Sequence, residues 1–511
     1  MRSDPRIYPL VLLLAACGPK SMGSLLDDDL QSSSDPGGSV SSNASTAQGD
    51  TGIGGESGAS TGAPPEPETT ASTSLDPGTS TGTMTDDRTI VQVSAHSVAA
   101  CALLSDGAVR CWGSNEVGEL GHGNDMTIGD DEHPWAGGDL QLSGPAQQIA
   151  VGGAHACALL ASGEVQCWGH GNDGSLGYGS LDHIGDDEVP AAVGTLDLDE
   201  PALQLFVGWR HNCVLLAGGR LRCWGFNIAG NLGYGHTQTI GDDETLAGLG
   251  DVSLGGEVVD VSLGLETSCA ILAGGDLRCW GNNYANVLGY AGIDLVGDDE
   301  LPSDLPPVDV GGPVVDVAAG AGRTCALLAS GVVRCWGENY HEGLGIGPVP
   351  SHCEEFEVCA TDPLCCIGDD ETPAMAPPVD VGATVVALSG GGLGTCALTD
   401  TGGVRCWGTN RVGMMGRGTT PPGIELCYPC TLDPGCCLGD DEPLPGLGDI
   451  SFGEPAAQLS VGQVTGCILT VSGAVRCWGY GEHGELGLAA TMHVGDDELP
   501  SDVPPVQVVH P

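Results

Sequence analysis

Residues 325–337 read Cys-Ala-Leu-Leu-Ala-Ser-Gly-Val-Val-Arg-Cys-Trp-Gly, and close variants of this stretch occur seven times in the 511-residue chain. The first cysteines of the copies are Cys101, Cys157, Cys213, Cys269, Cys325, Cys396 and Cys467. The first five are spaced by 56 residues, and the last two steps are 71 residues long. A fixed period of this length indicates stacked supersecondary units, because one unit alone cannot bury its apolar face.

Each copy is typical of a β-hairpin. Its turn ends in a glycine such as Gly331, which adopts a left-handed conformation without a steric penalty. Centring the turn on Ser330 places Cys325 opposite Cys335 as a non-hydrogen-bonded pair, where the Cα atoms approach closely enough for a disulfide. The same count predicts seven bridges: Cys101–Cys111, Cys157–Cys167, Cys213–Cys223, Cys269–Cys279, Cys325–Cys335, Cys396–Cys406 and Cys467–Cys477.

Two further strands are expected in each unit. One precedes the hairpin, as in residues 258–261, and the other ends the preceding copy, as in residues 251–254. Only three residues separate these two strands, so we expect them to pair with each other. A blade would then combine the last strand of one copy with the first three strands of the next copy.

The two ends of the repeat region decide the expected architecture. Residues 89–93 have no partner strand before them, and residues 506–509 have no blade after them. We therefore predict an all-β fold, a seven-bladed β-propeller of four-stranded blades, closed into a ring by the C-terminal strand pairing with the first blade. A parallel β-solenoid is the alternative, although its coils are usually shorter than this 56-residue period.

One known family shares this motif. Residues 153–160 (Gly-Ala-His-Ala-Cys-Ala-Leu-Leu), residues 163–169 (Gly-Glu-Val-Gln-Cys-Trp-Gly) and Leu176-Gly177 resemble the regulator of chromosome condensation repeat. They are most similar to its cysteine-bearing bacterial form, often described as alpha-tubulin-suppressor-like. The resemblance covers residues 89–511 and implies a seven-bladed propeller. It implies no single function, because that fold serves nucleotide exchange, chromatin binding, enzyme inhibition and adhesion.

The N-terminal region predicts export and anchoring. An apolar run over residues 7–16 ends in Leu14-Ala15-Ala16-Cys17, which resembles a bacterial lipobox. We expect residues 1–17 to be a lipoprotein signal peptide ending at the lipidated Cys17, with an ordinary secretory signal as the alternative. Residues 18–88 are rich in Ser, Thr, Gly, Pro and Asp without any aromatic residue, so a disordered tether is expected before the propeller at 89–511.

The cysteine count supports an oxidising compartment. Of 23 cysteines, fourteen lie in the hairpins, eight in two insertions, and Cys17 is left over. The insertions, near 351–366 and 419–437, hold Cys353, Cys359, Cys365 and Cys366, and Cys427, Cys430, Cys436 and Cys437. We expect disulfide pairs within each set. A zinc site is the alternative, because Cys427 and Cys430 have metal-like spacing.

Acidic residues dominate the charge. There are 68 Asp and Glu against 15 Lys and Arg, for a formal net charge of −53, which argues against nucleic-acid binding. A Gly-Asp-Asp-Glu segment recurs in every copy, and antiparallel strand order places all seven on the face opposite the hairpin turns. We interpret these segments as turns whose side chains cap backbone amides. The alternative is a set of calcium sites at Asp130, Asp131, Asp186, Asp187, Asp242, Asp243, Asp298, Asp299, Asp369, Asp370, Asp440, Asp441, Asp496 and Asp497.

Other repeated residues indicate a scaffold. Seven tryptophans follow the second hairpin cysteines, and we expect them to pack between blades rather than to stack on sugars. Six arginines precede the same cysteines, a regularity that indicates a structural role: Arg110, Arg222, Arg278, Arg334, Arg405 and Arg476. Trp135 and Trp209 lie outside the repeat pattern and are expected at the surface.

No catalytic constellation is evident, so no enzymatic activity and no cofactor are expected. A carboxylate pair for a hydrolase could come from any acidic loop, and that alternative stays open. The sequence predicts a monomeric, lipid-anchored protein of the bacterial cell envelope, at the outer membrane, cell surface or outside. We expect it to bind an extracellular protein through the paired insertions. The alternative is a glycan-binding or glycan-active protein that uses the central cavity.

Overall fold

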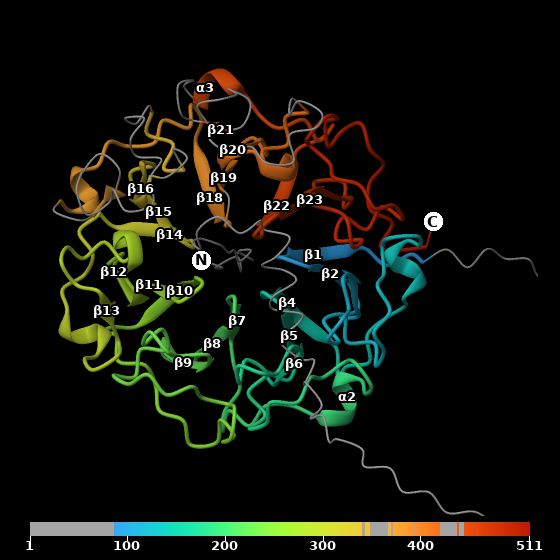
Figure 1. Cartoon of the computed structure of the whole chain (residues 1–511), viewed down its shortest axis with the longest axis horizontal. Coiled ribbons are helices and arrows are strands. Elements are labelled where there is room, and N and C mark those ends of the chain that lie inside the picture. Colours follow the sequence, from blue (N-terminus) through green and yellow to red (C-terminus); the bar gives the residue numbers. More distant parts are fainter. Residues whose placement is uncertain are drawn as a thin grey trace, which may run out of the picture. The chain divides into compact units, whose positions relative to one another are not determined.

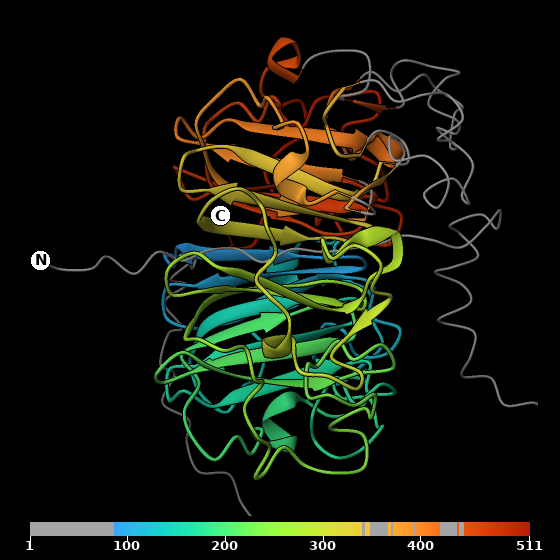
Figure 2. The same ribbon diagram turned by 90° about the vertical axis from the view of Figure 1, so that its left-hand side faces the viewer.

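Seven antiparallel β-sheets of three or four strands follow one another around a common centre (Figure 1). The computed structural model describes residues 86–339, 343–347, 366–368, 371–392, 394–418, 437–438 and 444–510. Each sheet begins with its innermost strand, and the chain then moves outward through the hairpin. Seen from the side, the strands run between the two faces of the repeat region (Figure 2). The all-β prediction is confirmed.

The first three sheets have three strands each: β1 (Ile90–Ala95), β2 (Ala99–Leu104) and β3 (Val109–Gly113); β4 (Ala146–Val151), β5 (His155–Leu160) and β6 (Val165–Gly169); β7 (Gln204–Val207), β8 (His211–Leu216) and β9 (Arg220–Gly225). The fourth sheet has β10 (Val258–Leu263), β11 (Thr267–Leu272), β12 (Leu277–Asn282) and the short β13 (Leu295–Val296).

The remaining sheets repeat this order. The fifth has β14 (Val314–Ala319), β15 (Arg323–Leu328), β16 (Val333–Glu338) and β17 (Cys366–Ile367); the sixth has β18 (Val385–Gly390), β19 (Gly394–Thr399), β20 (Val404–Thr409) and β21 (Cys437–Leu438). The seventh has β22 (Ala456–Val461), β23 (Thr465–Thr470) and β24 (Val475–Gly479).

Helices are few and short in the described part of the chain. The α-helices are α2 (Pro190–Val193) and α3 (Leu444–Leu447), and the 3-10 turns are η1 (Pro134–Ala136), η2 (Tyr284–Asn286), η3 (Pro302–Asp304), η7 (Pro373–Met375) and η8 (Arg411–Gly413). None of the helices in these ranges has the length and apolar character needed to cross a membrane.

The hairpin at the centre of each sheet forms as predicted. In the fifth sheet Cys325 pairs with Cys335 across β15 and β16, and the turn glycine Gly331 has a φ of +84°. The two cysteine Cα atoms are 4.1 Å apart and the side chains are joined by a disulfide. All seven hairpin disulfides are present. Each one ties the second strand of a sheet to the third.

The predicted partner of the last segment in each copy is wrong. Residues 251–254 do not pair with β10 as a hairpin; instead the Val252 N–H donates to the Leu221 carbonyl of β9, at 2.7 Å. The equivalent Leu140 donates to Val109 of β3 in the same way. Each of these segments therefore lies along the outer edge of its own copy's sheet. The three residues between this segment and the next strand do not form a hairpin turn. They lead the chain inward to the innermost strand of the next sheet.

The C-terminal segment follows this corrected rule. Val506 pairs with Val475 of β24, in its own copy, and not with a strand of the first sheet. The chain then reaches the first sheet through single hydrogen bonds: the Val508 carbonyl accepts from Arg110, and the His510 carbonyl accepts from the Asp86 N–H. The C-terminal segment was predicted to pair with a strand of the first blade, and this predicted partner is wrong. The segment instead pairs with the outer strand of the sheet in its own copy.

The repeat tryptophans join neighbouring sheets. All seven side chains are 0% exposed: Trp112, Trp168, Trp224, Trp280, Trp336, Trp407 and Trp478. The indole N–H of Trp168 donates to the Glu119 carbonyl of the preceding copy, at 3.0 Å. The indole of Trp112 makes the equivalent bond to the Glu485 carbonyl, which belongs to the last copy. The prediction that these tryptophans pack between units is confirmed.

Candidate functional site

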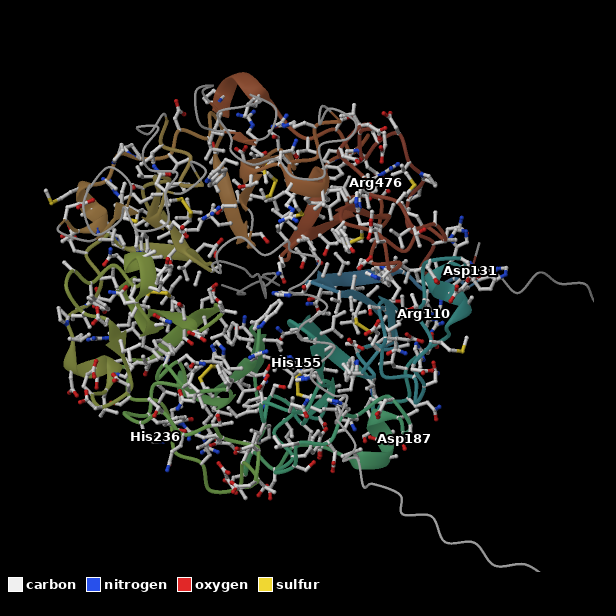
Figure 3. The ribbon with its side chains drawn as sticks, in the orientation of Figure 1. Arg110, Asp131, His155, Asp187, His236 and Arg476 are labelled. Atoms are coloured by element: carbon white, nitrogen blue, oxygen red, sulfur yellow. A yellow bond between two sulfur atoms is a disulfide. The ribbon has the colours of Figure 1, made fainter. Side chains whose placement is uncertain are left out.

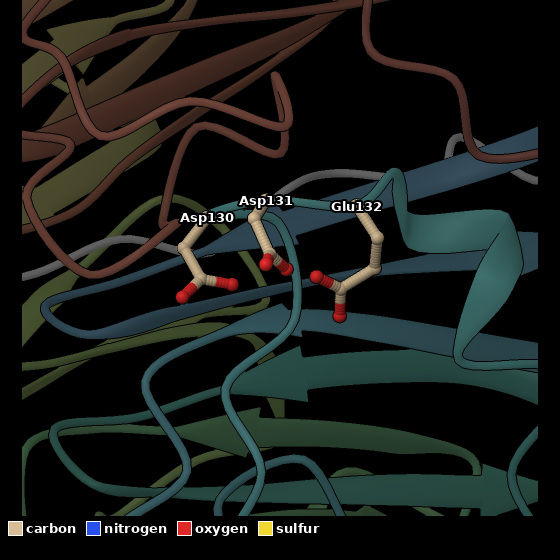
Figure 4. A group of neighbouring side chains, drawn as sticks. All are labelled: Asp130, Asp131 and Glu132. Carbon is tan, nitrogen blue, oxygen red and sulfur yellow. The ribbon is translucent and has the colours of Figure 1, made fainter.

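The recurring acidic segments form compact triads of carboxyl groups. Each follows the residue that pairs with the end of the third strand, as Ile128 pairs with Gly113, at the end of that strand away from the hairpin turn. In the first triad the three side chains lie side by side (Figure 4). Within the described residues, five triads have carboxylate oxygens within 4.8 Å of one another: Asp130–Asp131–Glu132, Asp186–Asp187–Glu188, Asp242–Asp243–Glu244, Asp298–Asp299–Glu300 and Asp496–Asp497–Glu498.

Crowding of the carboxyls changes their protonation. Partial burial and hydrogen bonding with the neighbouring Asp131 raise the pKa of Glu132 to about 7, and the same causes raise the pKa of Glu188 to about 7. Burial together with Asp497 raises the pKa of Glu498 to about 8. Glu132, Glu188 and Glu498 therefore hold a proton over part of the neutral pH range, and this lowers the negative charge of their triads.

The backbone of four described acidic segments, at Gly185, Gly241, Gly297 and Gly495, joins two neighbouring sheets. The Gly185 carbonyl accepts from the Gly123 N–H of the preceding copy at 2.8 Å, and the Gly241 carbonyl accepts from the Gly179 N–H at 3.1 Å. A Cβ at Gly185 would lie 2.4 Å from the Gly118 carbonyl oxygen, so only glycine fits this contact. This recurring contact supports the interpretation of the segments as scaffold turns.

Calcium stays an alternative use of the same side chains. Calcium takes six to eight oxygen ligands, and three neighbouring carboxyls could supply part of that shell. Beside one triad lies a pocket of about 550 Å³, lined by Leu181, Asp182, His183, Asp186, Asp187 and Glu188. Asp369 and Asp370 of the fifth acidic segment, and Asp440 and Asp441 of the sixth, lie outside the described residues.

Three buried histidines lie in the first three sheets. His155 is near the centre, whereas Asp131 and Asp187 lie towards the periphery (Figure 3). Burial lowers the pKa of His96 to about 3, of His155 to about 4 and of His211 to about 3. His155 Nε2 bonds to Asn212 Oδ1 at 2.8 Å, and His211 Nε2 bonds to Ser268 Oγ at 2.9 Å.

These histidines belong to the packing between sheets. The Ser268 hydroxyl donates to the Asn231 carbonyl, so it accepts from His211. That direction is the reverse of a serine activated by a histidine base, which would donate its own proton to the imidazole. The shared burial of His96, His155 and His211 was not predicted from the sequence.

The repeated arginines have the structural role that was predicted. The Arg222 guanidinium donates to the Leu198 carbonyl at 2.7 Å and pairs with Asp251 at 2.9 Å. The other five also donate to backbone carbonyls of the outer segments: Arg110 to Val508, Arg278 to Pro302, Arg334 to Ala376, Arg405 to Val381, and Arg476 to Pro500 and Val503. These arginines fasten the outer edge of six of the seven sheets, and the second sheet has Gln166 at the same position.

The two tryptophans outside the repeat pattern are half-buried. Trp135 contacts the His510 ring edge-on, with ring centroids 4.4 Å apart. Trp209 lies against the Gly153 backbone of the preceding copy, and its ring centroid is 5.7 Å from that of His96. The expectation that both are surface contacts is therefore only partly right, because each also packs against a neighbouring copy.

Several predicted site residues lie outside the described residues: Cys17, Cys353, Cys359, Cys365, Cys427, Cys430 and Cys436. Of the insertion cysteines, Cys366 is buried in β17 and disulfide-bonded, and Cys437 belongs to β21.

Repeated sheets that are joined in this way define a repeat protein of the β-propeller class. Residues 90–119, 146–175, 203–231, 258–286 and 314–342 match the Regulator of chromosome condensation (RCC1) repeat, and a second description of that repeat matches residues 106–159. These matches fall on the three inner strands of the first five sheets. The chain belongs to the RCC1 repeat family, as its sequence predicted.

Known relatives agree with this membership. The chain is 26% identical over 410 residues to the ultraviolet-B receptor UVR8 of Arabidopsis thaliana, covering 79% of this chain and 80% of the receptor. It is 30% identical over 255 residues to the human E3 ubiquitin-protein ligase HERC2, covering 49% of this chain. The chain spans only 5% of the length of that ligase.

Solved structures show the same fold. Yeast RCC1 (Prp20), solved bound to Kap60, is similar with a TM-score of 0.57 and 16% identity, over 81% of this chain and 84% of that chain. Human WBSCR16 is similar with a TM-score of 0.54 and 18% identity, over 76% of this chain and 93% of that chain. At these identities the likeness concerns the fold alone.

Proposed function

We propose that this chain is a lipid-anchored protein-interaction module of the bacterial cell envelope, built on a closed ring of seven blades. The RCC1-like propeller is a protein-interaction fold, and this is the observation that carries the proposal. Yeast Prp20 has been described with its binding properties to Gsp1p and histones, and those partners belong to that protein. For this chain the proposed partner is an extracellular protein.

Equivalent contacts support ring closure. The Gln92 amide donates to the Ile149 carbonyl and accepts from the Ile149 N–H, across the boundary between the first and second sheets. The Gln458 amide donates to the Val91 carbonyl and accepts from the Val93 N–H, between the last and first sheets. A similar glutamine contact between the last and first sheets supports the proposed closed ring.

Compartment and anchoring rest on the cysteines and the N-terminal region. Seven disulfides in one domain are typical of oxidising compartments, and they support export. Residues 1–17 would then act as the lipoprotein signal peptide, Cys17 as the lipidated residue and 18–88 as the tether. The charge of −53 favours a protein partner over nucleic acid.

The proposed role is non-catalytic, without a cofactor. The interaction site proposed from the sequence is the pair of insertions near 351–366 and 419–437. The seven repeat tryptophans are buried and offer a sugar no stacking surface, so the glycan alternative rests on the central cavity alone.

Anchoring is tested with Cys17→Ser in the full-length protein. After fractionation of the producing cells, we expect the natural protein in the membrane fraction and labelled by a radioactive fatty acid. The variant should lose the label and appear in a soluble fraction. Equal membrane association without label would contradict lipidation.

The interaction is tested by cross-linked capture on intact cells, with the mature protein as bait and a variant lacking residues 351–366 and 419–437 as the matched control. Capture of the same protein only by the intact bait would support the insertions as the site. Equal capture of the protein by both baits would indicate that the partner binds elsewhere on the propeller. Binding competed by free sugars, with no captured protein, would overturn the protein-interaction proposal.

A further inference from the structure

The innermost strands share an irregularity near their start. In β10 the register shifts between Val258 and Asp260, so Val259 is left out of the pairing with β11. The same shift occurs in β1, β4, β14, β18 and β22. Such a bulge turns one side chain out of the ladder. In the third sheet Leu203, directly before β7, occupies the equivalent sequence position.

The residues at this position are mostly aliphatic and exposed. They are Val91, Gln147, Leu203, Val259, Val315, Val386 and Ala457, and we call them the inner rim. Leu203 is 61% exposed, Val259 50%, Val315 49% and Val386 42%. Val259, Val315 and Val386 lie in the innermost strands of the fourth, fifth and sixth sheets, and Leu203 directly precedes the innermost strand of the third.

The rim lies on the face of the hairpin turns and next to the centre. Val258 pairs with Leu272, which directly precedes the turn between β11 and β12. The strands β1, β4, β7, β10, β14, β18 and β22 are those nearest the centre (Figure 1). This face is opposite the acidic triads, and it is distinct from the insertions that were proposed as a site above.

Acidic side chains surround the rim on this face. Exposed carboxylates occupy the hairpin turns and the approach to β10: Asp106, Glu164, Glu257, Asp276 and Asp400. The arginines here are ion-paired, Arg88 with Asp86, Asp106 and Asp139, and Arg220 with Glu200 and Asp251. The only lysine of the chain is Lys20, in the N-terminal region. The face is therefore apolar near its centre and negative around it.

We propose that the inner rim is a docking surface for a basic polypeptide segment that places aliphatic or aromatic side chains against Leu203, Val259, Val315 and Val386. This inference rests on the proposed protein-interaction function and names the chemistry of the partner. Exposed aliphatic groups favour an apolar contact because burying them removes apolar surface from water. The surrounding carboxylates select lysine and arginine next to those apolar residues and disfavour a second copy of this acidic chain.

The test uses two fluorescein-labelled peptides of equal charge, six Leu-Lys repeats and six Ser-Lys repeats, and fluorescence anisotropy at about 0.3 M salt to weaken unspecific attraction. The full mature protein is compared with a rim variant, Val259→Ser with Val315→Ser and Val386→Ser. Val193→Ser is the matched control, because Val193 is 41% exposed on α2, away from the rim.

We expect the Leu-Lys peptide to bind more tightly than the Ser-Lys peptide, and the rim variant to lose about tenfold or more of this affinity. The Val193→Ser variant and all binding of the Ser-Lys peptide should stay unchanged. Equal affinities for the two peptides, or an unchanged affinity of the rim variant, would overturn the proposal. Self-association in sedimentation experiments that the rim variant abolishes would assign the surface to a second copy instead.

Thermal unfolding of each variant checks that the fold is intact. If the triple variant does not fold, Val315→Lys serves in its place, because this half-exposed position tolerates a long side chain and the added positive charge should repel the Leu-Lys peptide. The rim variant is also used as bait in the cell-surface capture. A partner held equally by the rim variant and the natural protein would refute the rim while leaving the interaction function standing.

Discussion

Replacing Asp316 by asparagine should stabilise the protein, and increasingly so as the pH rises. Asp316 occupies the innermost-strand position where four of the other six copies have glutamine. Its carboxylate accepts from the Leu388 N–H at 2.7 Å and from the Val317 N–H at 2.9 Å. The amide of Gln92 also accepts from the next sheet but donates to it as well, which an ionised carboxylate cannot do.

The magnitude follows from protonation. Burial, with a contribution from the nearby Asp260, raises the pKa of Asp316 to about 8 from its usual value of 3.8. Between these values the folded state holds a proton that the unfolded state releases, so stability falls as the pH rises. At pH 7 this costs about 4 kcal/mol, at about 1.36 kcal/mol per pKa unit. Near pH 4 the cost is close to zero.

The assay is urea unfolding of the disulfide-intact protein, followed by tryptophan fluorescence at pH 4, 5.5, 7 and 8. Asp316→Asn should equal the natural protein at pH 4 and exceed it by a margin that grows towards pH 8. Asp276→Asn, in an exposed turn, is the control and should change the free energy of unfolding little at any pH. A variant that is less stable at pH 7, or one whose margin does not grow with pH, would refute the reasoning.

Four further outcomes are expected. The double substitution Cys213→Ala with Cys223→Ala removes a bridge with a sequence separation of 10 and should lower the free energy of unfolding by about 2–4 kcal/mol in the same assay. Trp168→Phe removes an indole hydrogen bond between sheets and should cost about 1–3 kcal/mol, measured by the urea midpoint. His96 stays neutral in the folded protein, whereas it gains a proton in the unfolded chain below about pH 6.5, so the free energy of unfolding decreases as the pH falls. His96→Leu should reduce this decrease by about 1.4 kcal/mol per pH unit. An unchanged dependence of the free energy of unfolding on acid pH would contradict the burial of His96 as its cause. Calcium should raise the melting temperature no more than magnesium at equal concentration; a calcium-specific rise that Asp187→Asn reduces would instead support a cation site.

Local rules carried much of the prediction. The pairing of Cys325 with Cys335 depends only on turn length and strand alternation, and both are visible in the sequence. The burial of the repeat tryptophans, and the bonding of the repeat arginines to carbonyls, also follow from their regular spacing. A residue that recurs at one place in every copy serves the contact that every copy makes.

The sequence was less successful at predicting which segments pair with one another. Residues 251–254 and 258–261 are close in sequence, yet Val252 bonds to Leu221 in its own copy's third strand. Sequence proximity could not distinguish a hairpin from a chain that turns inward to the next sheet. The same uncertainty led to the wrong partner for Val506 at the C-terminus.

The sequence by itself determined the β-class, the repeat unit, its hairpin and its seven disulfides, because these depend on period, turn residues and side-chain alternation within one copy. Only the tertiary structure decided which segment fills the outer edge of each sheet, which polar groups His155 and His211 bond to, and that the bulge residues Val259, Val315 and Val386 face solvent around the centre. These features arise where separate copies meet, and the free energy of such contacts depends on packing between residues that are tens of residues apart in the chain.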